Sequence, residues 1–87
     1  MITINIFYVY ALSSEYDNSI YVGMSQDVGR CLVEHNRGQV QSTRSKRPFR
    51  VVYKKEFCSR IDARRHEKYI KSGFGRKFIK RKIEQGL

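Results

Sequence analysis

The chain contains 87 residues, enough for one small domain, and this length excludes large folds such as a dinucleotide-binding sheet or a TIM barrel. Hydrophobic residues make up 40% of the chain and aromatic residues 13%, so it can form a core and is not a disordered tail. Its 18 Lys and Arg residues outnumber 8 Asp and Glu residues, and the net charge of +10 indicates a negatively charged partner.

The positive charge is concentrated in the second part of the chain. Residues 1–36 contain one basic and four acidic side chains, which gives a net charge of −3. Residues 37–87 contain 17 basic and four acidic side chains, which gives +13. Basic side chains interspersed with Tyr and Phe are typical of surfaces that bind phosphate backbones, so we expect a nucleic acid as partner. A basic protein without such a partner is the alternative.

The sequence does not indicate a secreted or membrane-embedded protein. The two cysteines, Cys31 and Cys58, are too few for a disulfide framework and lack the C-x-x-C spacing of a zinc motif. Residues 1–6 alternate polar with apolar residues and lack the positive charge of a signal peptide. No apolar run approaches the ~18 residues that span a membrane. We therefore expect a cytoplasmic protein with reduced thiols and no membrane contact.

The first half of the chain predicts a hairpin followed by a helix. Alternating apolar residues favour a strand over residues 2–12, with a second half that is covered on both faces. Turn-forming residues 13–19 separate it from a short strand over 20–24, so the two strands are expected to pair antiparallel. The next helix is capped by Ser25 or Asp27 and stops near Asn36 and Gly38. Its inner face has the spacing i, i+3, i+4, i+7 and consists of Val28, Cys31, Leu32 and His35.

The second half predicts a strand and two basic helices. Residues 38–48 have no apolar period and are expected to form an exposed basic loop. A strand follows over 49–57, with Val51, Tyr53 and Phe57 on one face and Val52 on the other. Ser59 begins a helix whose inner face carries Ala63, Glu67 and Ile70, and a last helix after residues 72–75 turns Phe78, Ile79 and Ile83 inward. We predict one domain, residues 1–87, in the order β-β-α-β-α-α: a three-stranded antiparallel sheet flanked by helices, α/β in composition and α+β in layout.

Four motifs occur in a characteristic order along these elements. The triplets Tyr8-Val9-Tyr10 and Tyr21-Val22-Gly23 lie on the paired strands, and Glu34-His35-Asn36 ends the first helix. The fourth motif is Ala63-x-x-x-Glu67-Lys68-x-Ile70-Lys71. Together they resemble the GIY-YIG nuclease family, above all its small single-domain members, over essentially the whole chain. The triplets take the places of the family's Gly-Ile-Tyr and Tyr-Ile-Gly, and the fourth motif is similar to its metal-binding helix.

The resemblance implies a metal-dependent endonuclease that hydrolyses phosphodiesters, with DNA favoured over RNA and branched, damaged or flapped DNA as candidate substrates, as in DNA repair. Glu67 would be the only protein ligand of a Mg²⁺ or Mn²⁺ ion that keeps its waters. Tyr10 would help to activate water, and Tyr21 would position the water or the phosphate. His35 would hydrogen-bond or transfer a proton, and Gly23 would allow close approach of the backbone.

Each of these residues also has an ordinary structural interpretation. Tyr10 and Tyr21 could pack on the sheet with their hydroxyls at the surface. His35 could be a cation at the negative end of a helix. Glu67 could pair with a basic residue on its own helix, and His66 is expected to be structural or exposed.

One position departs from the family pattern. The catalytic arginine of the family lies four residues before the histidine, where this chain has Cys31. Arg30 is a candidate substitute, although it would be rotated about 100° from Cys31 around the helix. The other candidates are Arg44, Lys46 and Arg47 of the basic loop. Because an arginine can contribute roughly 10³–10⁵ to the rate of phosphoryl transfer, we expect either a weakened site or a substituted cation. A cysteine introduced to inactivate or label the protein is the third interpretation.

Nucleic-acid binding does not depend on that arginine. Basic side chains of the loop and of the second helix are expected to contact phosphates, namely Arg44, Lys46, Arg47, Arg64, Lys68 and Lys71. The main alternative to an endonuclease is therefore a non-catalytic nucleic-acid-binding protein that retains the nuclease fold. RNA binding at the ribosome or a toxin-like role is a third hypothesis.

Overall fold

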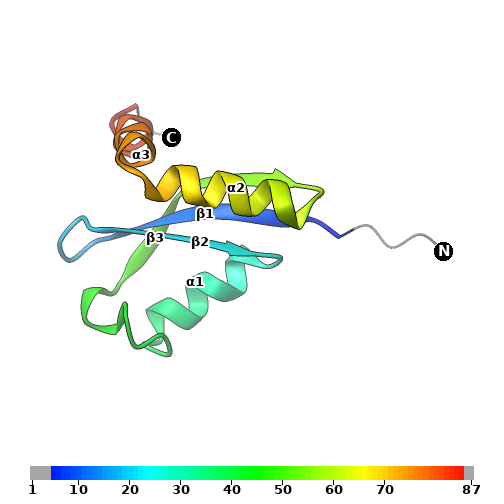
Figure 1. Ribbon diagram of the computed structural model, residues 1–87. Helices are drawn as coiled ribbons and strands as arrows, with labels where there is room; N and C mark the ends of the chain where they lie inside the picture. Colours follow the sequence, from blue (N-terminus) through cyan, green and yellow to red (C-terminus); the bar gives the residue numbers. More distant parts are fainter. Residues whose placement is uncertain (1–4, 86–87) are drawn as a thin grey trace.

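Residues 5–85 are described by a computed structural model, and within them three strands form one antiparallel sheet that is flanked by three α-helices (Figure 1). The elements are β1 (Phe7–Ser14), β2 (Ile20–Ser25), α1 (Val28–Asn36), the short 3₁₀ turn η1 (Arg44–Lys46), β3 (Phe49–Phe57), α2 (Arg60–Lys71) and α3 (Gly73–Glu84). The strand order is β2-β1-β3, so β1 is central. The predicted α+β fold and its order of elements are confirmed.

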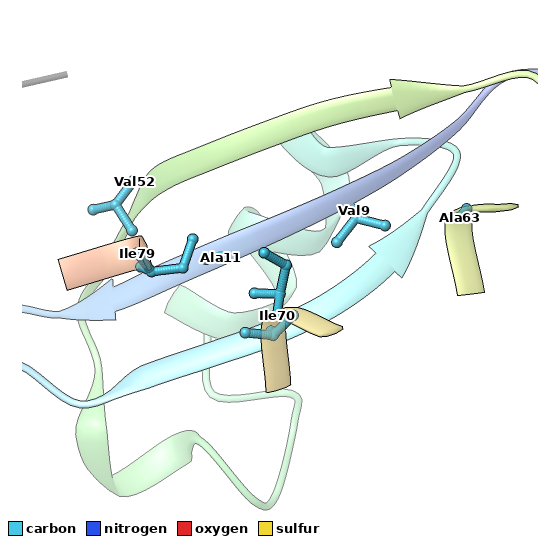
Figure 2. Packing of buried hydrophobic residues seen from close by; sticks show 7 residues of the cluster. Val9, Ala11, Val52, Ala63, Ile70 and Ile79 are labelled. Atoms are coloured by element: carbon cyan, nitrogen blue, oxygen red, sulfur yellow. The ribbon is translucent and has the colours of Figure 1, made fainter. Parts of the chain in front are cut away.

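The central strand separates two hydrophobic clusters. Val9 and Ala11 project toward α2 and α3, where they pack with residues such as Ile70 and Ile79 (Figure 2). Tyr10 and Leu12 have the opposite parity and pack on the other side of the sheet, toward α1. The nearly continuous apolar run of β1 therefore results from burial on both faces, as predicted.

The boundaries of β1 differ from the prediction. The expected strand began at residue 2, but residues 1–4 lie outside the described residues and Phe7 is the first strand residue. At its other end the strand continues through Ser13 and Ser14, which had been expected in the turn. Both serines are buried, and the Ser14 hydroxyl donates to the Lys46 carbonyl oxygen at 2.5 Å and accepts from the backbone N–H of Tyr16. These hydrogen bonds make a polar residue compatible with burial at the end of the strand.

A β-bulge corrects the predicted faces of β3. Ala11 pairs with Tyr53 and Leu12 pairs with Val51, so Val52 is an extra residue between them. The bulge reverses the alternation at this point, and Val52 joins Tyr53 in the cluster beneath α2 and α3. Val51, which was expected on that face, is 39% exposed instead.

The helices begin at the predicted caps. Asp27 accepts a hydrogen bond from the backbone N–H of Arg30, and Ser59 accepts one from that of Asp62. Ser72 separates α2 from α3 and accepts from the N–H of Gly75, so α3 begins at Gly73 rather than after the predicted break over residues 72–75. None of the helices within residues 5–85 is long and apolar enough to cross a membrane.

Candidate active site

Tyr10 lies in the middle of β1, directly opposite Gly23 of β2. A Cβ atom on residue 23 would lie 2.6 Å from the Tyr10 hydroxyl oxygen, so the missing side chain creates the space that the ring occupies. Tyr10 is only 3% exposed, which excludes the surface position considered above. Burial, followed by a hydrogen bond with the Cys31 thiol, raises the pKa of Tyr10 far above its ordinary value. The residue is therefore a neutral hydroxyl at pH 7.

His35 lies in the last turn of α1 and packs beside Tyr21, with 4.6 Å between the ring centroids. Its Nδ1 is 2.7 Å from the Thr43 hydroxyl oxygen, which is itself 3.4 Å from the carbonyl oxygen of Val40. Because a carbonyl oxygen only accepts, the hydroxyl proton of Thr43 is directed to Val40, and we assign the Nδ1–H of His35 as the donor to Thr43.

The charge state of His35 follows from its burial. His35 is 3% exposed, and burial lowers its pKa below the ordinary value of 6.5. At pH 7 the ring is therefore neutral. This state does not fit the alternative in which His35 is a cation at the helix end.

Glu67 approaches the same region from α2, which packs against β1 and β2. Its side chain is 15% exposed, and one carboxylate oxygen lies 3.3 Å from Lys71 Nζ, as the ion-pair alternative proposed. The carboxylate also contributes to the raised pKa of Tyr10, which indicates that it acts on the hydroxyl electrostatically. Lys71 in turn lines a hollow together with Tyr21. β2 is an edge strand of the sheet. Tyr21 packs on His35, and Tyr21 and Glu67 both act on the Tyr10 hydroxyl, so the four predicted residues lie in one region of the domain.

The structure places Cys31, not Arg30, beside Tyr10. The Cys31 thiol is half-buried, packs against the cluster that contains Tyr10 and contributes to the raised pKa of the Tyr10 hydroxyl. The Arg30 side chain is 77% exposed, and its Nε lies 3.6 Å from a carboxylate oxygen of Glu34. The two side chains point in different directions because consecutive residues are about 100° apart around an α-helix. A role for Arg30 as the substitute cation stays a prediction, and its orientation does not favour that role.

The basic loop after α1 folds back onto the end of that helix. Arg44 Nε donates to the Gly38 carbonyl oxygen at 2.8 Å, and the Arg47 guanidinium also lies against Gly38, whose φ is +77°. The N–H of Gly38 donates to the carbonyl oxygen of His35, so both guanidinium groups lie near the histidine end of α1. Lys46 pairs with Asp17 at 3.4 Å. These loop cations are exposed and available to a phosphate.

The basic residues of α2 form an exposed stripe beside Glu67. Arg64, Lys68 and Lys71 recur at i, i+4 and i+7, which places them on one side of the helix. His66 lies on another side, where its Nε2 is 2.7 Å from the Tyr53 hydroxyl and its ring packs against Phe57. The sequence left His66 as structural or exposed, and these contacts are structural ones.

Sequence reasoning missed Thr43. The residue was placed in a loop expected to be exposed, yet Thr43 is 5% exposed and Gly38 is buried as well. The loop is therefore only partly exposed, because Thr43 turns inward to hold His35. A threonine in a polar segment without periodicity gives no signal of such a contact.

Comparison with known proteins identifies close counterparts. The family model described as the GIY-YIG catalytic domain matches residues 6–82. The UPF0213 protein SSP2268 of Staphylococcus saprophyticus is 31% identical over 74 residues, which cover 84% of this chain and 89% of that protein. The UPF0213 protein SH2523 of Staphylococcus haemolyticus is 35% identical over 79 residues, 90% of this chain and 94% of its own length. The solution NMR structure of the UPF0213 protein BH0048 from Bacillus halodurans has 34% sequence identity and a TM-score of 0.53, covering 85% of this chain and 81% of that one.

Proposed function

Because the chain belongs to the GIY-YIG family, we propose that it is a divalent-metal-dependent endonuclease that hydrolyses phosphodiester bonds in DNA. The observation that carries the proposal is the meeting of two tyrosines, a neutral histidine and a carboxylate around β2. Branched, flapped or damaged DNA, as in repair, is the substrate class that we propose to test first. The proposal places the protein in the cytoplasm, where a thiol such as that of Cys31 stays reduced.

His35 is our candidate for the proton acceptor. A general base must be unprotonated at the working pH, and burial keeps the His35 ring neutral at pH 7. The hydrogen bond between Nδ1 and Thr43 leaves Nε2 as the nitrogen with a lone pair. Tyr10 and Tyr21 would hold the attacking water and the phosphate. Tyr10 would act in its neutral form, because its raised pKa excludes a phenolate at pH 7.

Glu67 fits a hydrated Mg²⁺ or Mn²⁺ ion. Within residues 5–85 no group of three or more His, Cys, Asp and Glu side chains could hold a metal together. One carboxylate, with water and substrate phosphate oxygens as the other ligands, is a common arrangement for a hard cation. Bound there, the ion would stabilise the negative charge that develops on the phosphate. Lys71, which pairs with Glu67, would be close enough to contact a phosphate oxygen.

Cys31 supports a second candidate function, a nucleic-acid-binding protein that does not hydrolyse its ligand. A thiol beside Tyr10 lacks the positive charge and the fixed donors of a guanidinium. The exposed cations of the loop and of α2 would still bind a phosphate backbone without it.

Replacing one carboxylate separates the two candidates. We expect the protein to cut supercoiled or branched DNA in Mg²⁺ or Mn²⁺, and Glu67→Gln to slow cutting by roughly 10²–10³-fold, the range seen when one charge-stabilising group is lost. Glu56→Gln is the matched control, since Glu56 is an exposed carboxylate on β3, at the opposite edge of the sheet. Salt-sensitive binding without cutting by any variant would support the binding protein instead.

A further inference from the structure

Three adjoining hollows run along the edge of the sheet between β2, the β1–β2 turn and α3. The first contains Tyr21 and Lys71, and it shares Ile20 and Arg76 with the second. The second shares Asn18, Ile20 and Lys80 with the third. Because each hollow shares residues with the next, they form one continuous surface groove, which we call the α3 groove. In Figure 1 the β1–β2 turn and α3 lie at the same end of the molecule.

Four cations line the α3 groove. Lys71, Arg76, Lys80 and Arg50 follow one another along it, and Ile20 supplies an apolar side chain that all three hollows share. Glu84 is the carboxylate that lines the hollow farthest from Lys71. A row of positive charges beside apolar surface suits the alternating phosphates and sugars of a nucleic-acid strand.

One end of the α3 groove reaches the candidate active site. Tyr21 lines the first hollow and packs against His35, and Lys71 pairs with the carboxylate of Glu67. A strand that leaves the site would therefore enter the groove beside the positive charge of Lys71. The loop cations Arg44 and Arg47 lie elsewhere, at the end of α1 on the other side of the sheet.

The helical period divides the basic residues of α3 into two sets. Arg76 and Lys80 are four residues apart, and both line the groove on the flank shared with Ile83. Lys77 and Arg81 are also four residues apart, but they project away from the sheet and line none of these three hollows. The helix therefore carries two pairs of identical composition that differ only in the direction they face.

We propose that the α3 groove binds the sugar–phosphate backbone of a nucleic-acid strand that continues past the cleavage position. This inference rests on the proposed function for its starting point and extends it to a second, non-catalytic binding surface. The substrate would then contact basic residues on both sides of the sheet. Arg44 and Arg47 would bind it on the loop side, and Arg76 and Lys80 would bind it on the α3 side.

The two pairs on α3 provide the test. Binding of a fluorescent 18-base-pair duplex is measured by anisotropy in EDTA, over a series of salt concentrations, for R76Q/K80Q and for K77Q/R81Q. Each double variant removes one arginine and one lysine from the same helix. We expect R76Q/K80Q to weaken binding by about 10-fold or more at 0.1 M salt and to reduce the slope of log K against log salt by about 1.8, or 0.9 per lost phosphate contact. The slope for K77Q/R81Q should stay close to that of the original protein.

Equal losses from the two pairs would overturn the proposal, because they would indicate a general attraction to the charged helix rather than a groove. No loss from either pair would overturn it as well. Thermal unfolding of both variants verifies that α3 still packs on the sheet. The binding assay contains no metal and follows no cleavage, so it can support the groove even if the Glu67 experiment shows no hydrolysis, and it can fail even if that experiment succeeds.

Discussion

At the scale of single residues, Cys31 is the position on which the expected rate of cleavage depends most. Its half-buried thiol packs near Tyr10, at the position that by resemblance corresponds to the family's catalytic arginine. A thiol cannot neutralise the charge of a pentacoordinate phosphate, and the nearest guanidinium in sequence, Arg30, projects into solvent beside Glu34. Cations for the phosphate would therefore have to come from Lys71 or from the basic loop.

We predict that Cys31→Arg raises metal-dependent cleavage by roughly 10- to 10³-fold, below the full contribution of a natural arginine because the surrounding residues have not adapted to it. Initial rates on branched DNA measure the effect. Arg30→Gln is the control, and it should leave the rate unchanged because its side chain is 77% exposed and faces away from Tyr10. A drop in rate for Arg30→Gln would instead identify Arg30 as the substitute cation.

At the scale of secondary-structure elements, local signals in the sequence predicted more than long-range ones. The caps Asp27 and Ser59 and the alternation of β1 are visible in the chain because their hydrogen bonds and burial depend on near neighbours. The bulge at Val52 reverses the faces of β3, and it depends on the partner strand β1. No periodicity within β3 itself could indicate it.

The same contrast between local and long-range signals applies to the candidate site. Tyr10, Tyr21, His35 and Glu67 could be identified because they occupy an ordered set of motifs, and the structure brings them together. The contact of Thr43 with His35 could not, because it joins a loop to a helix across eight residues without a motif. The pairing of Glu67 with Lys71 was one of two choices on α2, because Arg64 lies three residues before Glu67 and Lys71 four residues after it.

The pairing of β1 with β2 makes Gly23 a sensitive position. We predict that Gly23→Ala lowers cleavage by about 10²-fold or more, because its Cβ would lie 2.6 Å from the Tyr10 hydroxyl oxygen and would displace the ring. The expected loss in the free energy of unfolding is about 1–3 kcal/mol, typical of overpacking. Cleavage rates and urea unfolding of the same preparations measure the two effects.

Gly29→Ala is the control for Gly23→Ala. Gly29 lies within α1, where an added Cβ meets only the Asp27 carboxylate at 3.7 Å. Alanine there should keep the cleavage rate and increase stability by up to about 1 kcal/mol, since alanine is the better helix former. Equal cleavage rates for Gly23→Ala and Gly29→Ala would show that cleavage does not depend on the position of the Tyr10 ring against β2.

At the scale of the whole molecule, each layer contains one histidine, fully buried in the case of His35 and half-buried in the case of His66. His35 lies on the α1 side, next to Tyr21 and Phe49, and His66 lies on the α2 side, next to Tyr53 and Phe57. Burial lowers the pKa of both below 6.5, and the charge of Lys55 lowers that of His66 further. At pH values between these lowered pKa values and about 6.5, the unfolded chain therefore binds more protons than the folded protein.

We predict that the free energy of unfolding rises with pH through this window, because stability increases with pH wherever the unfolded state holds more protons. The stabilising contribution is complete above about pH 6.5 and is lost as the pH falls toward the folded-state pKa values. Asp17, whose pKa is lowered to about 2 by its hydrogen bonds with Ser19, titrates at more acidic pH and does not affect the window.

Urea unfolding at pH 5, 6, 7 and 8 measures the slope, and His66→Gln should reduce it without abolishing it, because His35 remains. A slope of zero in the unmodified protein would mean that both rings accept protons as readily in the folded state as in water, which would also remove the basis for assigning neutral His35 as the proton acceptor.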